Sequence, residues 1–438
     1  MTHMIRRRTA TLGLFGLLAA CSSNEHDIIT GVQIPVLPDE SGMDVSARAP
    51  AVTLPAANAL SAWPQPLANP AHRPGNVAGP LNFKPNWQVS IGAPGGYRQP
   101  LVASPVVAGG HVFTMDADAH VRAVSLADGS TLWHTSTRPP HVTTQNLGGG
   151  IAYESGKLYV STGFAEALAL DADTGKILWR QSMDFPARSA PLVAGGVVAI
   201  IIQNGLLLTF DPQSGAPGWR FSGSVGTPPM TAVSVIGAPA FSDGIIVAGF
   251  STGLLAAIDA ASGTPIWEQS LAAGFGQSSS LDLSDIVAPP VIAGGVVYAL
   301  NLDGTFMAVD LHSGAKVWTH GAAGMQPPAA SGGFLFLLDA KATLYAVHAD
   351  DGLVSWATSL PAYGNEKKKK NPIYWSGPVL INGTLVAVND RGEAILVDAR
   401  SGQIKQTVKL GAPADIAPLA VGGMLLQLTR NGCLTAYV

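Results

Sequence analysis

The sequence predicts an all-β fold, an eight-bladed β-propeller made of four-stranded antiparallel blades. Two repeated motifs predict it: a Gly turn that ends in a tryptophan, and an apolar hairpin that precedes it. Self-similarity at a period of about 40–50 residues indicates a repeat architecture. The composition agrees with many short strands joined by turns, because the chain holds 50 Gly and 32 Pro.

The first motif of each repeat is an apolar run, a Gly turn and a second apolar run. It predicts a hairpin, in which Gly adopts the positive φ that other residues avoid. The motif occurs eight times, at 105–113, 151–160, 191–199, 239–247, 290–298, 329–337, 378–386 and 418–426. A third strand follows each hairpin through another Gly turn, as in 301–310.

The second motif is an Asp-x-x-Ser/Thr-Gly turn that leads into a fourth strand carrying tryptophan. The Asp side chain can accept hydrogen bonds from the turn, and the indole can fill the space between neighbouring blades. We therefore assign a structural role to Trp133, Trp179, Trp219, Trp267, Trp318 and Trp356. A seventh copy, 396–406, has Gln406 at the tryptophan position, and we expect its outer strand to lack this packing.

The two motifs do not occur in equal number, and the difference predicts how the ring closes. Eight hairpins are followed by only seven Gly-turn motifs, and residues 431–438 match a third strand. An isolated copy of the fourth strand stands at 86–91, with Trp87. We predict that this N-terminal strand completes the last blade, so that no long strand edge is left open.

The first 20 residues have the features of a secretory signal peptide: Arg6–Arg8, then a short apolar run at 9–18. The sequence Leu-Ala-Ala-Cys at 18–21 resembles the bacterial lipobox, in which Cys21 would be acylated; an ordinary secretory signal is the alternative. Acylation would anchor the protein to a membrane. In lipoproteins of this kind, the Ser that follows Cys21 favours the outer membrane.

The rest of the chain divides at about residue 83. Residues 21–82 are rich in Pro, Ala and Ser without strand periodicity, and we expect a tether there. The propeller then occupies 83–438. Cys433 lies in its apolar last strand, where we expect an unreactive buried thiol.

The repeat ALDADTGKILW at 169–179 resembles that of pyrroloquinoline-quinone-type propellers, and the resemblance extends over nearly all of 83–438. Two classes share this repeat: quinone-dependent dehydrogenases and outer-membrane assembly lipoproteins of the BamB type. The first class implies a calcium site in the channel, and many members carry adjacent cysteines or a Cys-x-x-Cys-His haem motif. This sequence contains neither of those cysteine motifs, although calcium ligands among its channel residues stay open.

The BamB-type resemblance implies a non-catalytic scaffold without a cofactor, lipid-anchored at the periplasmic face of the outer membrane. Its implied partner is the BamA-type insertase, with other assembly subunits and unfolded β-barrel proteins as further candidates. The resemblance implies contacts through the loop at 283–291, where Asp285 and Ser284 stand, although Val287 replaces a second acidic residue. It also implies a loop at 231–235, around Val233, which lacks the expected arginine. A turn cap is the alternative role for Asp285, and a binding propeller with an unrelated partner is a third reading of the chain.

One dense run of charge stands out, at Lys367, Lys368, Lys369 and Lys370. It is either a solvated loop or a contact for an acidic protein surface or anionic lipid. The net charge of −4 disfavours nucleic-acid binding, and the histidines have no metal-ligand spacing.

Overall fold

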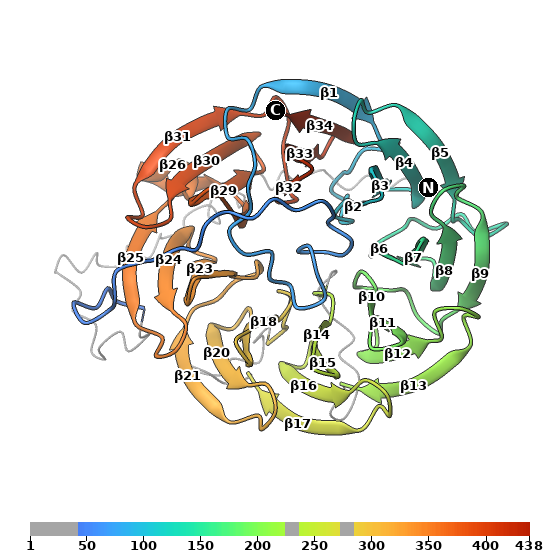
Figure 1. The fold of residues 1–438 in the computed structure, drawn as a ribbon, viewed down its shortest axis with the longest axis horizontal. Helices are drawn as coiled ribbons and strands as arrows, with labels where there is room; N and C mark the ends of the chain where they lie inside the picture. Colours follow the sequence, from blue (N-terminus) through green and yellow to red (C-terminus); the bar gives the residue numbers. More distant parts are fainter. Residues whose placement is uncertain (1–42, 224–235, 272–283) are drawn as a thin grey trace, which may run out of the picture. The chain divides into compact units, whose positions relative to one another are not determined.

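Eight four-stranded antiparallel sheets surround a central axis in the computed structural model (Figure 1). The structure describes residues 43–223, 236–271 and 284–438. The predicted eight-bladed propeller is thereby confirmed. Within each blade the first strand lies next to the channel and the fourth lies at the rim.

The first four blades are contiguous in sequence. Blade 1 comprises β2 (Val106–Ala108), β3 (His111–Met115), β4 (His120–Ser125) and β5 (Thr131–Ser136). Blade 2 comprises β6 (Gly149–Glu154), β7 (Lys157–Thr162), β8 (Glu166–Asp171) and β9 (Ile177–Ser182). Blade 3 comprises β10 (Leu192–Ala194), β11 (Val197–Ile201), β12 (Leu206–Phe210) and β13 (Pro217–Ser222). Blade 4 comprises β14 (Ala240–Ser242), β15 (Ile245–Gly249), β16 (Leu254–Asp259) and β17 (Pro265–Ser270).

The next three blades repeat the pattern, and a small hairpin separates the last two of them. Blade 5 comprises β18 (Val291–Ala293), β19 (Val296–Leu300), β20 (Thr305–Asp310) and β21 (Lys316–Gly321). Blade 6 comprises β22 (Ala329–Ser331), β23 (Phe334–Leu338), β24 (Thr343–His348) and β25 (Val354–Ser359). The hairpin comprises β26 (Tyr363–Asn365), the 3₁₀-helix η1 (Glu366–Lys368) and β27 (Lys370–Pro372). Blade 7 comprises β28 (Trp375–Ile381), β29 (Thr384–Asn389), β30 (Glu393–Asp398) and β31 (Ile404–Lys409).

Blade 8 joins the two ends of the propeller. It contains β32 (Leu419–Val421), β33 (Met424–Thr429), β34 (Cys433–Tyr437) and, as its outer strand, β1 (Pro85–Ser90). Trp87 pairs with Ala436, and Val89 with Leu434. The predicted closure by an N-terminal strand is confirmed, and it removes the edge that β34 would otherwise expose.

The two faces of the ring carry different connections. The hairpin turns and the Asp–Gly turns lie on one face, since Leu126 N donates to Gly110 O and Ala172 N to Gly156 O. We call this the turn face; it is the face seen in Figure 1. The loops between blades lie on the other, the loop face, where Leu360 N donates to Ala342 O at the start of one such loop.

The repeated tryptophans join each blade to the next. Each indole N–H donates to a carbonyl of the following blade's Asp–Gly turn, at 2.8–3.2 Å. The ring also lies on that turn's glycine: a Cβ on Gly175, whose φ is +71°, would meet the Trp133 ring at 2.4 Å. Gly is therefore required there twice, for its backbone conformation and for the close approach of the indole. Buried apolar side chains fill the remaining space between blades, as between blades 5 and 6.

The way the ring closes explains why position 406 carries Gln and not Trp. Its neighbour, blade 8, has β1 as its outer strand, so no Asp–Gly turn joins β34 to that strand. A tryptophan at 406 would have no such turn to pack against, and Gln406 is exposed. Trp87 restores the pattern across the closure, because its indole donates to Leu126 O of blade 1.

Residues 43–82, which the sequence places in a tether, lie across the turn face as far as the structure describes them (Figure 1). They form no extended strand, but Trp63 forms a bridge to Val107 and Val77 forms one to Ile381. Trp63, His72 and Val77 are almost fully buried. The packed unit therefore begins well before residue 83, the boundary that the repeats indicate.

Candidate partner-binding surface

The loop face opens into an apolar cavity in the channel. Its volume is about 350 Å³, and its wall carries Leu101, Met325 and Ile416 from three interblade loops. Trp63 and Leu67, from the segment on the turn face, also line it. A cavity of this kind suits an apolar side chain better than a charged ligand.

Asp285 and Ser284 lie in the interblade loop that leads into blade 5. Asp285 is 4% exposed, and its Oδ1 is buried without a hydrogen-bond partner. Burial raises the pKa of the Asp285 carboxyl to about 6, because a charged form is poorly solvated there. Its backbone holds the loop, since Leu302 N donates to Asp285 O. The carboxyl is thus beneath the surface in this structure, while Ser284 is half-buried.

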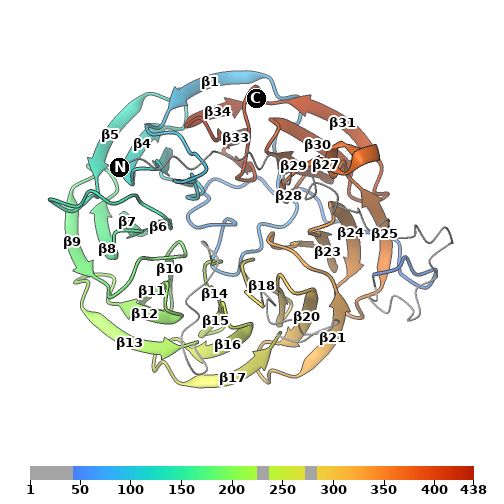
Figure 2. The same ribbon diagram turned by 180° about the vertical axis from the view of Figure 1, so that it is seen from behind.

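The lysine run forms an ordered hairpin on the loop face, nearest the viewer in Figure 2. Asn365 Oδ1 accepts from Lys368 N, and Glu366 Oε1 accepts from the backbone N–H groups of Ala362 and Tyr363. All four lysines are exposed. Tyr374, just beyond the hairpin, is 67% exposed and adds an aromatic ring to the same region. The fold therefore concentrates positive charge beside an exposed aromatic side chain.

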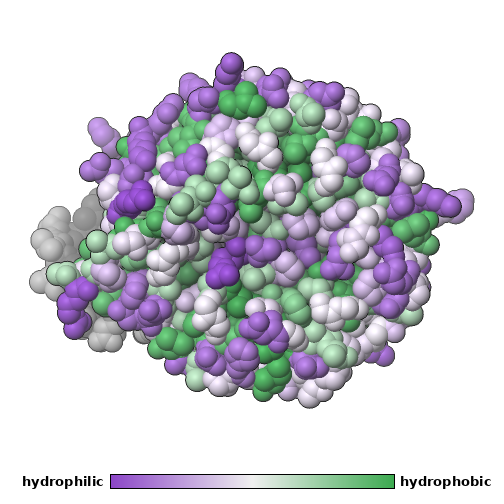
Figure 3. Space-filling model, in the orientation of Figure 1, coloured by the Kyte–Doolittle hydropathy of each residue, from purple (hydrophilic) through white to green (hydrophobic). Residues whose placement is uncertain are grey.

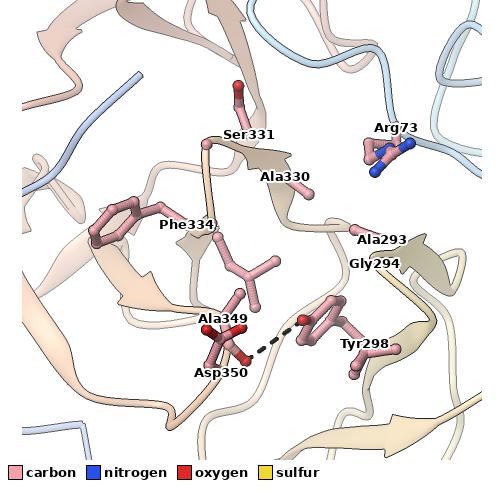
Figure 4. Close-up of a pocket in the computed structure, with 13 residues that line it drawn as sticks. Arg73, Ala293, Gly294, Tyr298, Ala330, Ser331, Phe334, Ala349 and Asp350 are labelled. Atoms are coloured by element: carbon pink, nitrogen blue, oxygen red, sulfur yellow. Dashed lines mark hydrogen bonds between the residues drawn. The ribbon is translucent and has the colours of Figure 1, made fainter. Parts of the chain in front are cut away.

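A second pocket, of about 210 Å³, lies on the turn face between blades 5 and 6 (Figure 4). Arg73 lies over one side of it and Asp350 at another, and the Tyr298 hydroxyl donates to Ala349 O at 3.4 Å. Both charged side chains are exposed, and the rest of the lining is mostly Gly, Ala and other apolar residues. The pocket is smaller than the loop-face cavity, at about 210 against 350 Å³, and we treat it as the weaker candidate.

Three of the predicted features lie outside the described residues: Cys21, Val233 and Leu283, the first residue of the predicted contact loop at 283–291. The prediction of lipidation and of contacts at 231–235 therefore stays a prediction. Sequence reasoning missed the contribution of Trp63 and its neighbours to the channel. The one signal was an aromatic residue inside a Pro-rich stretch.

Two carboxylates of the described residues near the channel, Asp415 and Asp116, are bound to groups of the protein itself. In residues 43–223, 236–271 and 284–438, no three His, Cys, Asp or Glu side chains are placed to hold a metal ion. Asp415, which lines the cavity, is held by Arg430 in a two-pronged pair at 2.5 and 2.6 Å. Asp116 accepts from the N–H groups of Ala93, Asp118 and His120. These carboxylates serve turns and ion pairs.

The model of the family described as outer membrane protein assembly factor BamB matches residues 84–146 and 117–358. The chain belongs to the BamB family. A BamB of Yersinia pestis is 28% identical over 360 residues, which cover 80% of this chain and 88% of the relative. The crystal structure of BamB from Moraxella catarrhalis superposes with a TM-score of 0.65 at 17% identity, over 80% of this chain and 99% of that one.

Quinone enzymes share part of the repeat. The quinohemoprotein alcohol dehydrogenase ADH IIB of Pseudomonas putida is 31% identical over 148 residues, but these cover 30% of this chain and 21% of the enzyme. The BamB of Yersinia pestis, by contrast, matches over most of both chains. Among the residues that the structure describes, no helix is long and apolar enough to cross a bilayer.

Proposed function

We propose that this protein is a non-catalytic scaffold for the assembly of β-barrel proteins in the outer membrane. In this proposal an acylated Cys21 holds it at the periplasmic face, and its loop face binds the periplasmic domains of a BamA-type insertase. The observation that carries the proposal is the family match over 84–358, together with a relative aligned over 88% of its length. Neither a cofactor nor a reaction is part of it.

The loop face supports the proposal because it offers varied side chains on a rigid frame. Loops positioned by a rigid scaffold commonly carry binding residues. The apolar mouth can receive an apolar side chain, and Lys367–Lys370 can pair with an acidic surface. Positive charge at the rim would chiefly speed association and orient the partner. Anionic lipid is the other surface that this run suits.

The rim of the ring suits client strands. Leu132, Leu178, Ile266 and Val317 stand one residue before a tryptophan on outer strands, and each is 44–46% exposed. Outer strands present unpaired backbone groups, to which an extended chain can add by strand pairing. We propose that unfolded β-barrel proteins make transient contacts of this kind.

Co-purification tests the function directly. The full chain, tagged after Val438, is isolated from solubilised envelopes, and its partners are identified by mass spectrometry. We expect the barrel insertase among them, and its absence under conditions that retain other outer-membrane lipoproteins would count against the proposal. A Cys21→Ser variant is the matched control for anchoring: it should leave the outer-membrane fraction but still bind the insertase in detergent extract.

The alternative is a quinone-dependent dehydrogenase, which the partial match to the Pseudomonas putida enzyme favours. Calorimetric titration of the full chain with pyrroloquinoline quinone and Ca²⁺ separates the two functions. We expect no saturable heat. Stoichiometric binding would favour the dehydrogenase, in spite of the scattered carboxylates.

A further inference from the structure

Residues 58–77, called the strap from here on, form a closed loop over the turn-face end of the channel. Asn58 N donates to Asn76 O at 2.9 Å, and Ala78 N donates to Asn58 O at 2.8 Å, so the two ends of the strap meet. Figure 1 shows this loop across the centre of the ring, and in Figure 2 it lies behind the blades. The space-filling view of the same face shows no opening at its centre (Figure 3).

The strap makes the same contact with successive blades. The residues concerned lie at one register position of the innermost strand, three residues before the last Gly of each hairpin turn. In blades 1, 2, 4 and 5 the backbone N–H at this position donates to a strap carbonyl, at 2.7–3.0 Å. The pairs are Val107 to Trp63, Tyr153 to Pro64, Phe241 to Pro70 and Ile292 to Ala71.

Blade 3 receives a side chain in place of a backbone group. Gln65 Nε2 donates to Val193 O at 2.7 Å, and Val193 N donates to Gln65 Oε1 at 3.3 Å. The amide thus provides the donor and acceptor that a neighbouring strand would provide. Gln65 is almost fully buried. Its amide therefore satisfies backbone groups of the inner strand that would otherwise be buried without a hydrogen bond.

Blades 7 and 8 are held as well, but with other registers. Val77 N donates to Leu380 O, and Gly422 N donates to Leu60 O. Blade 6 is the exception: within the described residues, the N–H of Ala330 donates no hydrogen bond to the strap. Ala330 lines the turn-face pocket, at the place where the strap passes from blade 5 to blade 7 (Figure 4).

The composition of the strap suits this role. Proline has no N–H to donate, and Pro64 and Pro70 contribute carbonyl oxygens as acceptors. Leu67, Ala68 and His72 have φ between 57° and 76°, which turns the chain inwards along a tight curve. A segment of this kind can follow a ring of strand edges, which a straight strand cannot do.

We infer that the inner strand edges form a peptide-binding track and that the strap is its built-in occupant. Its presence closes the turn-face mouth to any other extended chain. A ligand or partner segment can then enter the channel only from the loop face, where it meets Trp63 and Leu67 at the far end of the cavity. The inference concerns this chain's own edges and stands whether or not the protein binds an insertase.

Deleting the strap and then adding it back as a synthetic peptide tests the inference. Because Asn58 and Val77 form a parallel bridge, a linker between them must reverse the chain direction twice, so residues 59–76 are replaced by a flexible Gly/Ser linker of about 12 residues within the full chain. In this variant we expect the amides of Val107, Tyr153, Val193, Phe241 and Ile292 to exchange with deuterium about tenfold faster or more. A synthetic peptide of residues 58–77 should bind the variant with 1:1 stoichiometry, restore slow exchange, and fail to bind the intact protein. Unchanged exchange, or equal binding of the peptide to both proteins, would overturn the inference.

A point variant covers the case in which the deletion does not fold. Gln65→Leu in the full chain should speed exchange at Val193 by about tenfold and leave Val107 unchanged. Gln99→Leu is the matched control, since Gln99 Nε2 donates to Ala117 O on the loop face. Equal exchange at Val193 in wild type, Gln65→Leu and Gln99→Leu would contradict the assignment.

Discussion

The two mouths of the channel are built in opposite ways. On the turn face, short turns and one closed segment satisfy the inner strand edges, and His72 and Gln65 are buried there. On the loop face, long connections surround an apolar cavity, and Met325 is 51% exposed at its rim. The contrast fits our proposal that one face serves stability and the other binds the partner.

Loss of the ring closure is the most damaging change, because both mouths depend on it. Truncation after Leu426 removes the second half of β33 and all of β34, the strand that pairs with β1 in blade 8. We expect loss of the cooperative unfolding transition, measured by circular dichroism and calorimetry. Removal of Val438 alone is the control and should keep the transition; a near-native melt of the long truncation would show that the closure is dispensable.

The second-largest effect is expected from substituting one residue at each mouth and comparing the losses in the free energy of unfolding. Trp63 is 2% exposed at the closed end, so Trp63→Ala should lower the free energy of unfolding by about 3–5 kcal/mol. Met325→Ala, at the open rim, should change it by no more than about 0.5 kcal/mol. Urea denaturation measures both. Equal losses would remove the distinction between a stabilising mouth and a binding mouth.

The two mouths should also respond to pH with opposite sign. Burial lowers the pKa of His72 to about 4, so unfolded chains bind more protons than folded ones between about pH 4 and 6.5. This contribution reduces stability as the pH falls, by about 3 kcal/mol across the window. Burial raises the pKa of Asp285 to about 6, so between pH 6 and 3.8 the folded chain binds more protons and gains stability as the pH falls.

Variants resolve the two contributions. His72→Gln should reduce the loss of stability on acidification, and Asp285→Asn should increase it, in urea titrations at a series of pH values. Nδ1 of His72 faces Pro290 O, and no charged group lies in that contact. The same slope in wild type and both variants would mean that neither group titrates as its burial requires.

The smallest effect on stability is expected at the lysine hairpin. Changing Lys367–Lys370 to Ser should leave the melting temperature unchanged, because all four side chains are exposed, but should weaken association with the insertase. Binding measured at low and high salt checks this, since the difference should shrink as salt screens the charges. Unchanged binding at low salt would make the run a solvated loop.

The repeat pattern was enough to predict the fold, because each motif reports a local turn or a contact between neighbours. Counting the motifs also located the closure at Trp87. The reason for Gln406 could not be predicted from the sequence, because it depends on blade 8, whose outer strand comes from the start of the chain. The strap could not be predicted either, because Pro64, Gln65 and Pro70 show no periodicity and contact strands far away in sequence. The burial of Asp285 likewise depends on packing between blades that its sequence does not encode locally.

Site-specific photo-crosslinking tests the central claim that the loop face binds the assembly machinery. A photoreactive residue replaces Tyr374 or Ser284 on the loop face, or His312 on an Asp–Gly turn of the turn face, in cells that make the full chain. We expect the barrel insertase to be recovered from the loop-face positions and not from His312. Recovery from His312 alone, or of no assembly component from any position, would contradict the claim.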